Sequence, residues 1–490
     1  ASAAPAPVPG DWRGRSFGVD AWRFGGAVGV ATALSIAQFL LFPRLLDVPT
    51  YGAFRVFVVY GVYAGVLHLG LPDGAYVRWA GRDAGQVLAE WRRTAAWLTA
   101  LQVVVMALAL VVATQVSSQR VAVTIAALGG FAAAANQLTL ATCALQAIGE
   151  FRRAGMLAVL PPAALLLGIL LVPEAARTLP AVLSLAVIAQ VIPAVLAASW
   201  LRAARVSEGQ AAPATVRVGE TGVAGRANGA TATGVLSPSL LLRLGIPVLV
   251  ANLIAGLAQS VDRLLLSVAI PVEQFALYGF ATSALVVANA VTQSFARVAL
   301  PHGARLPADE RPAFYARLHA LIAAGFGVGL ALYPLVEAIV AGFIPAYVPA
   351  LPIMRALLPG ALVGVALHVV VFTSLLVRKA VRTQLAIAAT VAMLVFLASG
   401  VAIVLAAPLW VVAATASGAL AAGWAIGSFV AGRGAGMARA SGAGGFALTG
   451  TLQLGALAIA LWLTDSVVAR TATYAVLAAA PTVLAWRRAT

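Results

Sequence analysis

Arginine side chains occur inside stretches of this sequence that are otherwise apolar. Arg55, Arg263 and Arg355 each lie near one end of such a stretch, and Arg297 lies in another. A guanidinium is planar and can hold two phosphate oxygens at once. A long arginine side chain can also extend along apolar surface until its charge reaches water or lipid headgroups. These residues therefore indicate either an anion-binding site or anchors at a membrane surface.

Polar side chains repeat at helical spacing in three of the apolar stretches. Residues three or four positions apart share one face of a helix, and polar groups facing lipid are costly, so these faces should point into the protein. They either line a polar cavity or hydrogen-bond one helix to the next. The three sets are Asn289, Gln293 and Arg297; Asn252, Gln259, Asp262 and Arg263; and Thr139, Thr142, Gln146 and Glu150.

Four titratable residues in the apolar stretches are candidates for carrying protons or ions. The imidazoles of His68 and His368 titrate near neutral pH, although a histidine in such a place more often packs through a hydrogen bond. Asp262 either neutralises the arginine beside it or couples ions, and Glu337 is equally ambiguous. Because Cys143 is the only cysteine, a disulfide framework is excluded, and we expect no metal site and no cofactor.

The composition indicates the elements that must position these groups. Hydrophobic residues make up 62% of the chain and charged residues 10%, against roughly 25% charged residues in ordinary soluble domains. The apolar runs have about the 20 residues that a helix needs to cross a bilayer. The alternating runs of about 10 residues that are typical of a membrane β-barrel do not occur. The sequence therefore predicts an all-α polytopic membrane protein.

The apolar runs predict about fourteen membrane spans. A hydrophilic stretch rich in Gly, Ala, Thr and Ser separates the first six from the other eight and is typical of a flexible linker. The predicted spans are 24–46, 51–71, 95–115, 121–147, 154–172, 180–201, 240–267, 275–299, 317–343, 350–377, 383–406, 408–431, 446–464 and 471–486.

The distribution of positive charge predicts the orientation. With the N-terminus inside, 25 of the 32 arginines and lysines fall on the inner side, as expected where cationic loops stay in the cytoplasm. Both termini are therefore expected in the cytoplasm. The same bias explains the net charge of +16, so we expect no nucleic-acid partner. The first 20 residues lack the apolar core of a signal peptide.

Two short motifs occur on both sides of the linker. Tyr51-Gly52 returns as Tyr278-Gly279, and Leu71-Pro72-Asp73-Gly74-Ala75 returns as Leu300-Pro301-His302-Gly303-Ala304, at offsets of 227 and 229 residues. The motifs also suit turns at helix ends. Because six spans is an even number, two such copies would enter the membrane in the same direction, as in some secondary transporters.

This repeat predicts a division of the chain into two lobes and a trailing pair of helices. We expect a disordered cytoplasmic tail at 1–23, an N-terminal lobe at 24–201, a flexible cytoplasmic linker at 202–239, a C-terminal lobe at 240–431, a cytoplasmic loop at 432–445, and two further spans with the C-terminal tail at 446–490.

Several motifs in this order resemble the bacterial Wzx-type polysaccharide flippases of the multidrug/oligosaccharidyl-lipid/polysaccharide exporter superfamily. The resemblance covers residues 24 to 486. The Ser-Arg-x-x-Gly start of the lipid II flippases in the same superfamily is absent, which argues against a peptidoglycan substrate. The motifs are Phe42-Pro43-Arg44-Leu45-Leu46 with Tyr51-Gly52, Gly70-Leu71 with Tyr76-Val77-Arg78, Leu145-Gln146-Ala147-Ile148-Gly149-Glu150-Phe151-Arg152, and Ser260-Val261-Asp262-Arg263-Leu264.

The resemblance implies two six-helix lobes around a central cavity, and a transporter rather than an enzyme. Its substrate would be a polyprenyl-diphosphate-linked oligosaccharide, moved across the bacterial plasma membrane by alternating access. An ion gradient or the membrane potential would drive it, which agrees with the absence of a Gly-x-x-x-x-Gly-Lys-Ser/Thr motif for ATP. Arg55 lies where lipid II flippases carry a cavity arginine, so it leads the diphosphate-binding candidates, ahead of Arg263, Arg355 and Arg297.

Two other functions remain open. A drug/cation antiporter of the same superfamily needs acidic residues deep in the N-terminal lobe, where the predicted spans are nearly free of acids. A membrane glycosyltransferase or polysaccharide polymerase needs catalytic groups on sizeable outer loops, and all the predicted outer loops are short. Besides its lipid-linked substrate and membrane lipids, we expect the chain to be a monomer that contacts a polysaccharide polymerase or glycosyltransferases.

Overall fold

A computed structural model describes most of the chain. The described residues are 15–79, 82–210, 236–284, 299, 303, 306–307, 309–378, 380–433, 443–464 and 466–489. They contain 13 helices that are long and apolar enough to cross a membrane. The predicted all-α polytopic fold is thus confirmed. Part of one predicted span, 275–299, lies outside the described residues.

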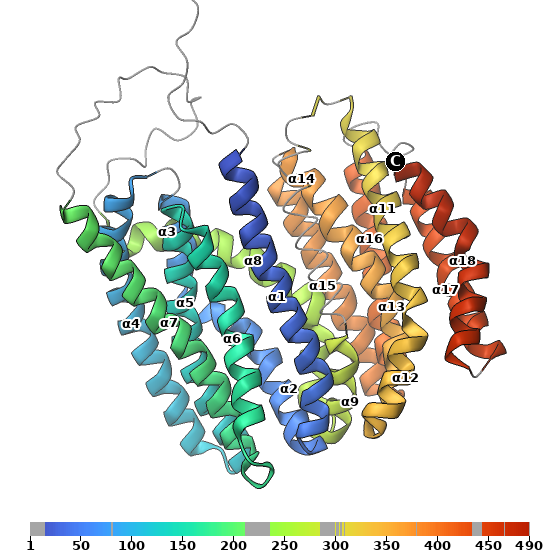
Figure 1. The fold of residues 1–490 in the computed structure, drawn as a ribbon, viewed down its shortest axis with the longest axis horizontal. Helices are drawn as coiled ribbons and strands as arrows, with labels where there is room; N and C mark the ends of the chain where they lie inside the picture. Colours follow the sequence, from blue (N-terminus) through green and yellow to red (C-terminus); the bar gives the residue numbers. More distant parts are fainter. Residues whose placement is uncertain are drawn as a thin grey trace, which may run out of the picture. The chain divides into compact units, whose positions relative to one another are not determined.

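The helices follow the predicted spans closely, and Figure 1 shows them in chain order. In the first half they are α1 (Arg15–Leu45), α2 (Val48–Val62), η1 (Tyr63–His68), α3 (Leu71–Trp79), α4 (Ala84–Gln115), α5 (Gln119–Ala147), α6 (Phe151–Leu171), η2 (Glu174–Ala176) and α7 (Leu179–Gln210). In the second half they are α8 (Pro238–Ala269), α9 (Val272–Ser283), α11 (Arg311–Ala331), α12 (Tyr333–Phe343), η3 (Pro345–Ala350), α13 (Leu351–Ala366), η4 (Leu367–Phe372), α14 (Thr373–Val377), α15 (Val381–Val404), α16 (Leu409–Arg433), α17 (Ala443–Leu463) and α18 (Val467–Ala489).

Two helices extend beyond the predicted spans into segments expected to be irregular. Helix α1 begins at Arg15, within the predicted tail 1–23, and α7 continues to Gln210, within the predicted linker 202–239. Alanine and arginine, which are frequent at the end of α7, favour the helix in water as well as in lipid. The apolar runs mark only the part of a helix that lies in the membrane, so hydropathy underestimates its length.

The contacts divide the chain into two compact units. Unit 1 comprises residues 1–34, 63–171 and 183–249, and unit 2 comprises residues 35–62, 172–182 and 250–490. Both α1 and α8 therefore contribute residues to each unit. The predicted lobes are consecutive parts of the sequence, whereas these units group residues by their contacts. The two divisions are therefore of different kinds, and the division into lobes stays a prediction.

In unit 1 the second predicted span ends in a break of the helix. A 3-10 segment, η1, leads to Leu69 and Gly70, whose φ angles are 53° and 83°. The break frees carbonyl groups that no water can satisfy inside a bilayer. Asn136 of α5 donates a hydrogen bond to the Ala64 carbonyl (3.1 Å), and Gln102 of α4 donates one to the Leu67 carbonyl (3.0 Å). These two amides allow the chain to turn into α3.

Glycines hold α3 against α8 in unit 1. The backbone of Gly70 packs directly against the backbone of Gly245, and Gly74 packs against the backbone carbonyl of Leu241. A Cβ atom on Gly245 would overlap the carbonyl oxygen of Gly70. Only glycine permits so close an approach of two backbones, as in other membrane helix pairs built on small residues.

In unit 2 the two copies of the Tyr-Gly motif meet. Helix α2 packs on α9, and Gly52 of the first copy lies on the Val272 carbonyl at the start of α9. Tyr51 and Phe280 both pack against Tyr347, with ring centroids 5.4 Å and 4.8 Å away. The repeated Tyr-Gly motif therefore lies at the interface between α2 and α9.

The trailing helices α17 and α18 pack on α11 in unit 2. Gln453 of α17 is buried, and its amide donates hydrogen bonds to the Ala323 carbonyl (3.1 Å) and the Thr482 hydroxyl (3.0 Å). Tyr474 of α18 donates one to the Gly327 carbonyl (2.8 Å). Polar contacts of this kind fix membrane helices to one another, because lipid offers them no alternative partner.

The glycine contact predicts a contrast between two alanine substitutions in α8. Gly245→Ala should destabilise the protein by about 1–3 kcal/mol, because the added methyl group forces the two backbones apart. Gly256→Ala is the matched control, since nothing lies within 4 Å of the added atom, and it should be neutral or slightly stabilising. Thermal unfolding of the detergent-solubilised variants measures both, and equal midpoints would contradict the contact.

Candidate functional site

Arg55 lies in the second turn of α2 and faces α9 within unit 2. A Cβ atom on Gly279 would come within 2.9 Å of the Arg55 Cβ and 3.3 Å of its Nε, so the side chain lies directly on that glycine. Its Nε is buried and has no hydrogen-bond partner. No described carboxylate lies within ion-pair distance of Arg55. Its positive charge is therefore held in place by packing and remains without an acidic partner.

Arg263 of α8 adds a second cation beside the first. It is near enough to repel the charge of Arg55, and its guanidinium donates a hydrogen bond to the Gln259 carbonyl. Its Nε lies 3.7 Å from Asp262 Oδ1. Asp262 thus lies within ion-pair distance of Arg263 and not of Arg55, so the two arginines leave an excess of positive charge at this place in unit 2.

Asp262 has a further partner that limits its freedom. The hydroxyl of Tyr278, in α9, donates a 2.6 Å hydrogen bond to Asp262 Oδ2, and both residues are buried. One oxygen of this carboxylate therefore accepts from a hydroxyl, and the other lies beside an arginine. In this structure Asp262 has the geometry of a partner for Arg263.

Gln259 and His368 meet at a small cavity in unit 2 that combines polar and apolar side chains. The cavity has a volume of about 80 Å³ and is lined by α8, α9, α13, η4, α15 and α16, including Arg263 and Ser417. His368 Nδ1 lies 3.0 Å from the Gly364 carbonyl, which can only accept, so Nδ1 carries the proton. Nε2 then accepts from the Gln259 amide at 3.1 Å. A second proton on His368 would require that amide to rotate.

Glu337 is the centre of a three-residue ion cluster in unit 2. The Arg355 Nε lies 2.7 Å from Glu337 Oε1, and an Arg470 terminal nitrogen lies 3.2 Å from Oε2. The carboxylate is buried, while the Arg355 side chain is 43% exposed. The cluster joins α12, α13 and α18, and it places Glu337 between two arginines.

The other predicted candidates lie apart from this group. His68, in unit 1, accepts a hydrogen bond from the Gly70 amide on Nδ1 (3.0 Å), and its Nε2 lies 3.8 Å from the Asp73 carboxylate. Burial raises the pKa of Asp73 above its ordinary value. Asn252 is exposed on α8, and Gln146 is partly buried in α5. Asn289, Gln293 and Arg297 lie outside the described residues.

Three residues of the site were not singled out from the sequence. Tyr51 and Tyr278 belong to the repeated Tyr-Gly motif, which suits helix starts equally well, so nothing in the pattern distinguished a role beside Arg55 and Asp262. Arg470 lies 133 residues from Glu337. Only the fold could bring that pair together.

The charges in the described membrane spans follow one rule. These spans contain three carboxylates, Glu90, Asp262 and Glu337, and each lies within 4 Å of an arginine. Glu90 in α4 is held by Arg78 and Arg82, with shortest distances of 2.8 Å and 2.9 Å. Each carboxylate in the described spans is thus paired with an arginine, whereas no described carboxylate lies within ion-pair distance of Arg55.

The Glu337 cluster predicts a loss of stability on neutralisation. Glu337→Gln should lower the free energy of unfolding by about 2 kcal/mol, less than the roughly 3–5 kcal/mol of a fully buried pair, because Arg355 is partly solvated. Glu174→Gln, at an exposed residue of η2, is the matched control. The thermal unfolding midpoints decide, and an unchanged midpoint in Glu337→Gln would refute the structural role.

The fold of this chain is similar to those of several solved membrane proteins. No family model matches the sequence, and no curated protein matches it either. Among solved structures the chain is similar to the lipid II flippase MurJ in an inward closed conformation, with a TM-score of 0.66 and 11% identity over 95% of this chain and 98% of that one.

Two multidrug transporter structures are also similar. An inward-facing multidrug resistance MATE family transporter of the MOP superfamily gives a TM-score of 0.60 at 11% identity, over 84% of this chain and 95% of that one. MATE in complex with MaL6 gives 0.54 at 12%, over 84% and 94%. The neighbours are transporters and a flippase rather than enzymes. The chain is thus a multi-pass membrane protein with the fold of MOP superfamily transporters.

Proposed function

We propose that this protein is a flippase for a polyprenyl-diphosphate-linked oligosaccharide. The observation that carries the proposal is the pair Arg55 and Arg263, of which only Arg263 has a carboxylate, Asp262, within ion-pair distance among the described residues. A diphosphate is an anion whose oxygens fit guanidinium groups in pairs. The similarity in fold to a lipid II flippase supports this class of substrate. The sequence resemblance to Wzx-type flippases supports an oligosaccharide rather than a peptidoglycan precursor.

The same proposal includes the source of energy and the setting. Alternating access driven by an ion gradient or the membrane potential suits a chain without an ATP-binding motif. His368, with its single-proton geometry toward Gln259 and Gly364, is the best-placed candidate among the described residues for proton coupling. We place the protein in a bacterial plasma membrane with both termini in the cytoplasm, near the polymerase or glycosyltransferases that use the same lipid.

A drug/cation antiporter is the second candidate, because solved structures of multidrug transporters are also similar to this chain in fold. A cationic drug needs a carboxylate that is not already neutralised. In the described spans each carboxylate is paired with arginine. The charge balance thus favours the anionic lipid as substrate. The two functions can be separated by removing the protein, because one predicts a defect in lipid export and the other a defect in drug resistance.

Removal of the protein from its native cell tests the substrate. We expect polyprenyl-diphosphate oligosaccharides to accumulate on the inner side of the membrane, measured by mass analysis of extracted lipids, with surface polysaccharide reduced. Drug susceptibility is measured in the same cells. Increased susceptibility without lipid accumulation would assign the antiporter function instead.

Arg55→Ala should abolish most of this export while the protein still inserts in the membrane. Loss of one charge-assisted phosphate contact costs about 1.5–3 kcal/mol, roughly a tenfold to hundredfold loss of affinity. Arg120→Ala, at an exposed residue that starts α5, is the matched control and should export normally. Normal surface polysaccharide in Arg55→Ala cells would exclude the diphosphate-binding role.

Gly279→Ala tests the position of Arg55 without changing any charge. The added methyl group would approach the Arg55 Cβ and Nε, so the side chain must move. We expect reduced export with thermal stability lowered by less than in Gly245→Ala, because the added atom would come within 2.9 Å of the Arg55 Cβ, whereas on Gly245 it would overlap a backbone carbonyl oxygen. Gly256→Ala again serves as the control, and export equal to the wild type in Gly279→Ala would show that the placement of Arg55 is unimportant.

A further inference from the structure

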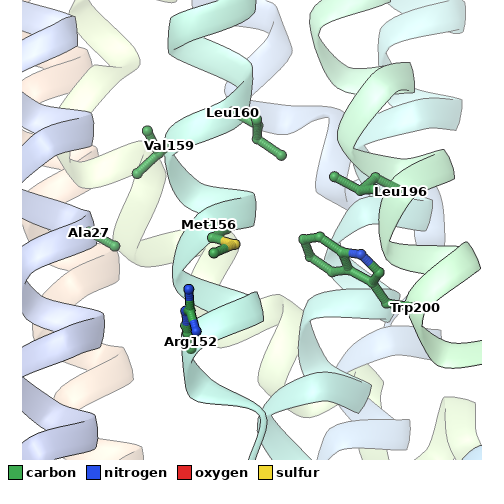
Figure 2. A pocket seen from close by; sticks show the side chains of 7 residues that line it. All are labelled: Ala27, Arg152, Met156, Val159, Leu160, Leu196 and Trp200. Carbon is green, nitrogen blue, oxygen red and sulfur yellow. The ribbon is translucent and has the colours of Figure 1, made fainter. Parts of the chain in front are cut away.

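A pocket at one end of unit 1 combines an arginine with an apolar interior. It has a volume of about 450 Å³ and lies between α1, α6 and α7, lined by Ala27, Arg152, Met156, Val159, Leu160, Leu196 and Trp200. Figure 2 shows Arg152 at one end of the pocket, with the apolar side chains beyond it and the Trp200 ring across from Met156. This arrangement matches an amphipathic molecule better than a fully polar one.

The pocket lies at the membrane–water interface. Arg152 is the second residue of the span 151–171, and Trp200 is near the end of the span 179–203. The start of α6 and the end of α7 lie on the same side of the membrane, because the two helices are consecutive spans, and tryptophan and arginine are typical of the headgroup region. From Arg152 to Leu160 the helix rises roughly 12 Å, so the apolar part extends into the hydrocarbon.

The charge at the mouth of the pocket favours an anion. No described carboxylate lies within ion-pair distance of Arg152, and its side chain is exposed. Its neighbour Arg153 lies 3.7 Å from Glu150 and 5.9 Å from the centre of the Trp200 ring. Helix α6 begins at Phe151, so its positive end also lies at this place. The net charge around the mouth is therefore positive.

We propose that this pocket binds an anionic phospholipid, with the headgroup phosphate at Arg152 and one acyl chain between α6 and α7. The guanidinium of Arg152 donates to phosphate oxygens, and Met156, Val159, Leu160 and Leu196 surround the upper part of the chain. Met156 is 39% exposed in the protein alone, and an acyl chain would cover it. On the predicted orientation, the lipid comes from the inner leaflet.

A photoactivatable phosphatidylglycerol with a diazirine in its acyl chain tests the site on the purified full-length protein. Peptide mapping should find the label within residues 151–160 and 196–200. Excess phosphatidylglycerol should compete for this labelling, and phosphatidylcholine of the same chain length should compete less well. Labelling that both lipids suppress equally would overturn the anionic preference and with it the proposal. Transport is not needed for this measurement, so its result is separate from that of the proposed function.

Two variants separate the headgroup from the chain. Arg152→Ala should weaken the competition by phosphatidylglycerol roughly fivefold, as expected for one arginine at a lipid surface. Ala27→Trp keeps every charge but fills the pocket, and it should remove the label from 151–160. Arg93→Ala is the matched control, because Arg93 is exposed in the first third of α4 and does not line the pocket.

Three further results would overturn the proposal. The first is equal competition by phosphatidylglycerol in Arg152→Ala and Arg93→Ala, which would show that Arg152 contributes only general surface charge. The second is unchanged labelling of 151–160 in Ala27→Trp. The third is competition by undecaprenyl phosphate at lower concentration than by phosphatidylglycerol, which would assign the pocket to the transported lipid. Size-exclusion profiles of the variants confirm that each one is folded.

Discussion

The hydrocarbon core of a bilayer offers no hydrogen-bond partner to a polypeptide backbone, and this constraint explains most of the structure. Thirteen described helices satisfy their own backbone groups along the membrane. Where the helix breaks at Tyr63–His68, the freed carbonyls of Ala64 and Leu67 receive side-chain donors from Asn136 and Gln102. The departure from regular helix is thus possible only because two other spans place amides beside it.

The hydrocarbon core also limits where charged side chains can lie. An ion without a partner is costly in lipid, and the three carboxylates of the described spans accordingly lie against arginines. Arg55 is the contrast, since its buried Nε has no hydrogen-bond partner. The packing of Arg55 on Gly279 holds the side chain in place. A cation kept in this condition suits a protein that must bind and release an anion, because no carboxylate has to be displaced first.

Close helix contacts in both units depend on glycine. Gly245 meets Gly70 in unit 1, and Gly52 meets Val272 in unit 2. In each case the absence of a Cβ atom brings backbones together and fixes the neighbouring polar groups. Gly279 does the same for a side chain, and it belongs to the motif that recurs along the sequence. The repeated Tyr-Gly pair therefore helps to build the α2–α9 interface on which Arg55 depends.

The sequence by itself determined the class of fold and nearly all the helices. Each apolar run has about the 20 residues that a helix needs to cross the hydrocarbon core. This requirement applies to each span separately, so a span can be recognised without knowing its neighbours. The same runs missed the helical extension of α7 to Gln210, since a helix outside the membrane leaves no hydropathy signal. They also missed the turn at Leu69 and Gly70, whose stability comes from α4 and α5.

The candidate site shows the same division between sequence and fold. Residue types and spacing identified Arg55, Asp262, Arg263, His368 and Glu337, because a polar group in an apolar span is unusual wherever it occurs. Their partners came from the tertiary structure: Tyr278 for Asp262, Gln259 for His368, and Arg470 for Glu337. Whether an arginine in a span is neutralised or free depends on distances of a few ångströms between helices far apart in the chain. The sequence therefore determined which residues carry charge in the membrane, and only the packing of the helices decided which charges cancel.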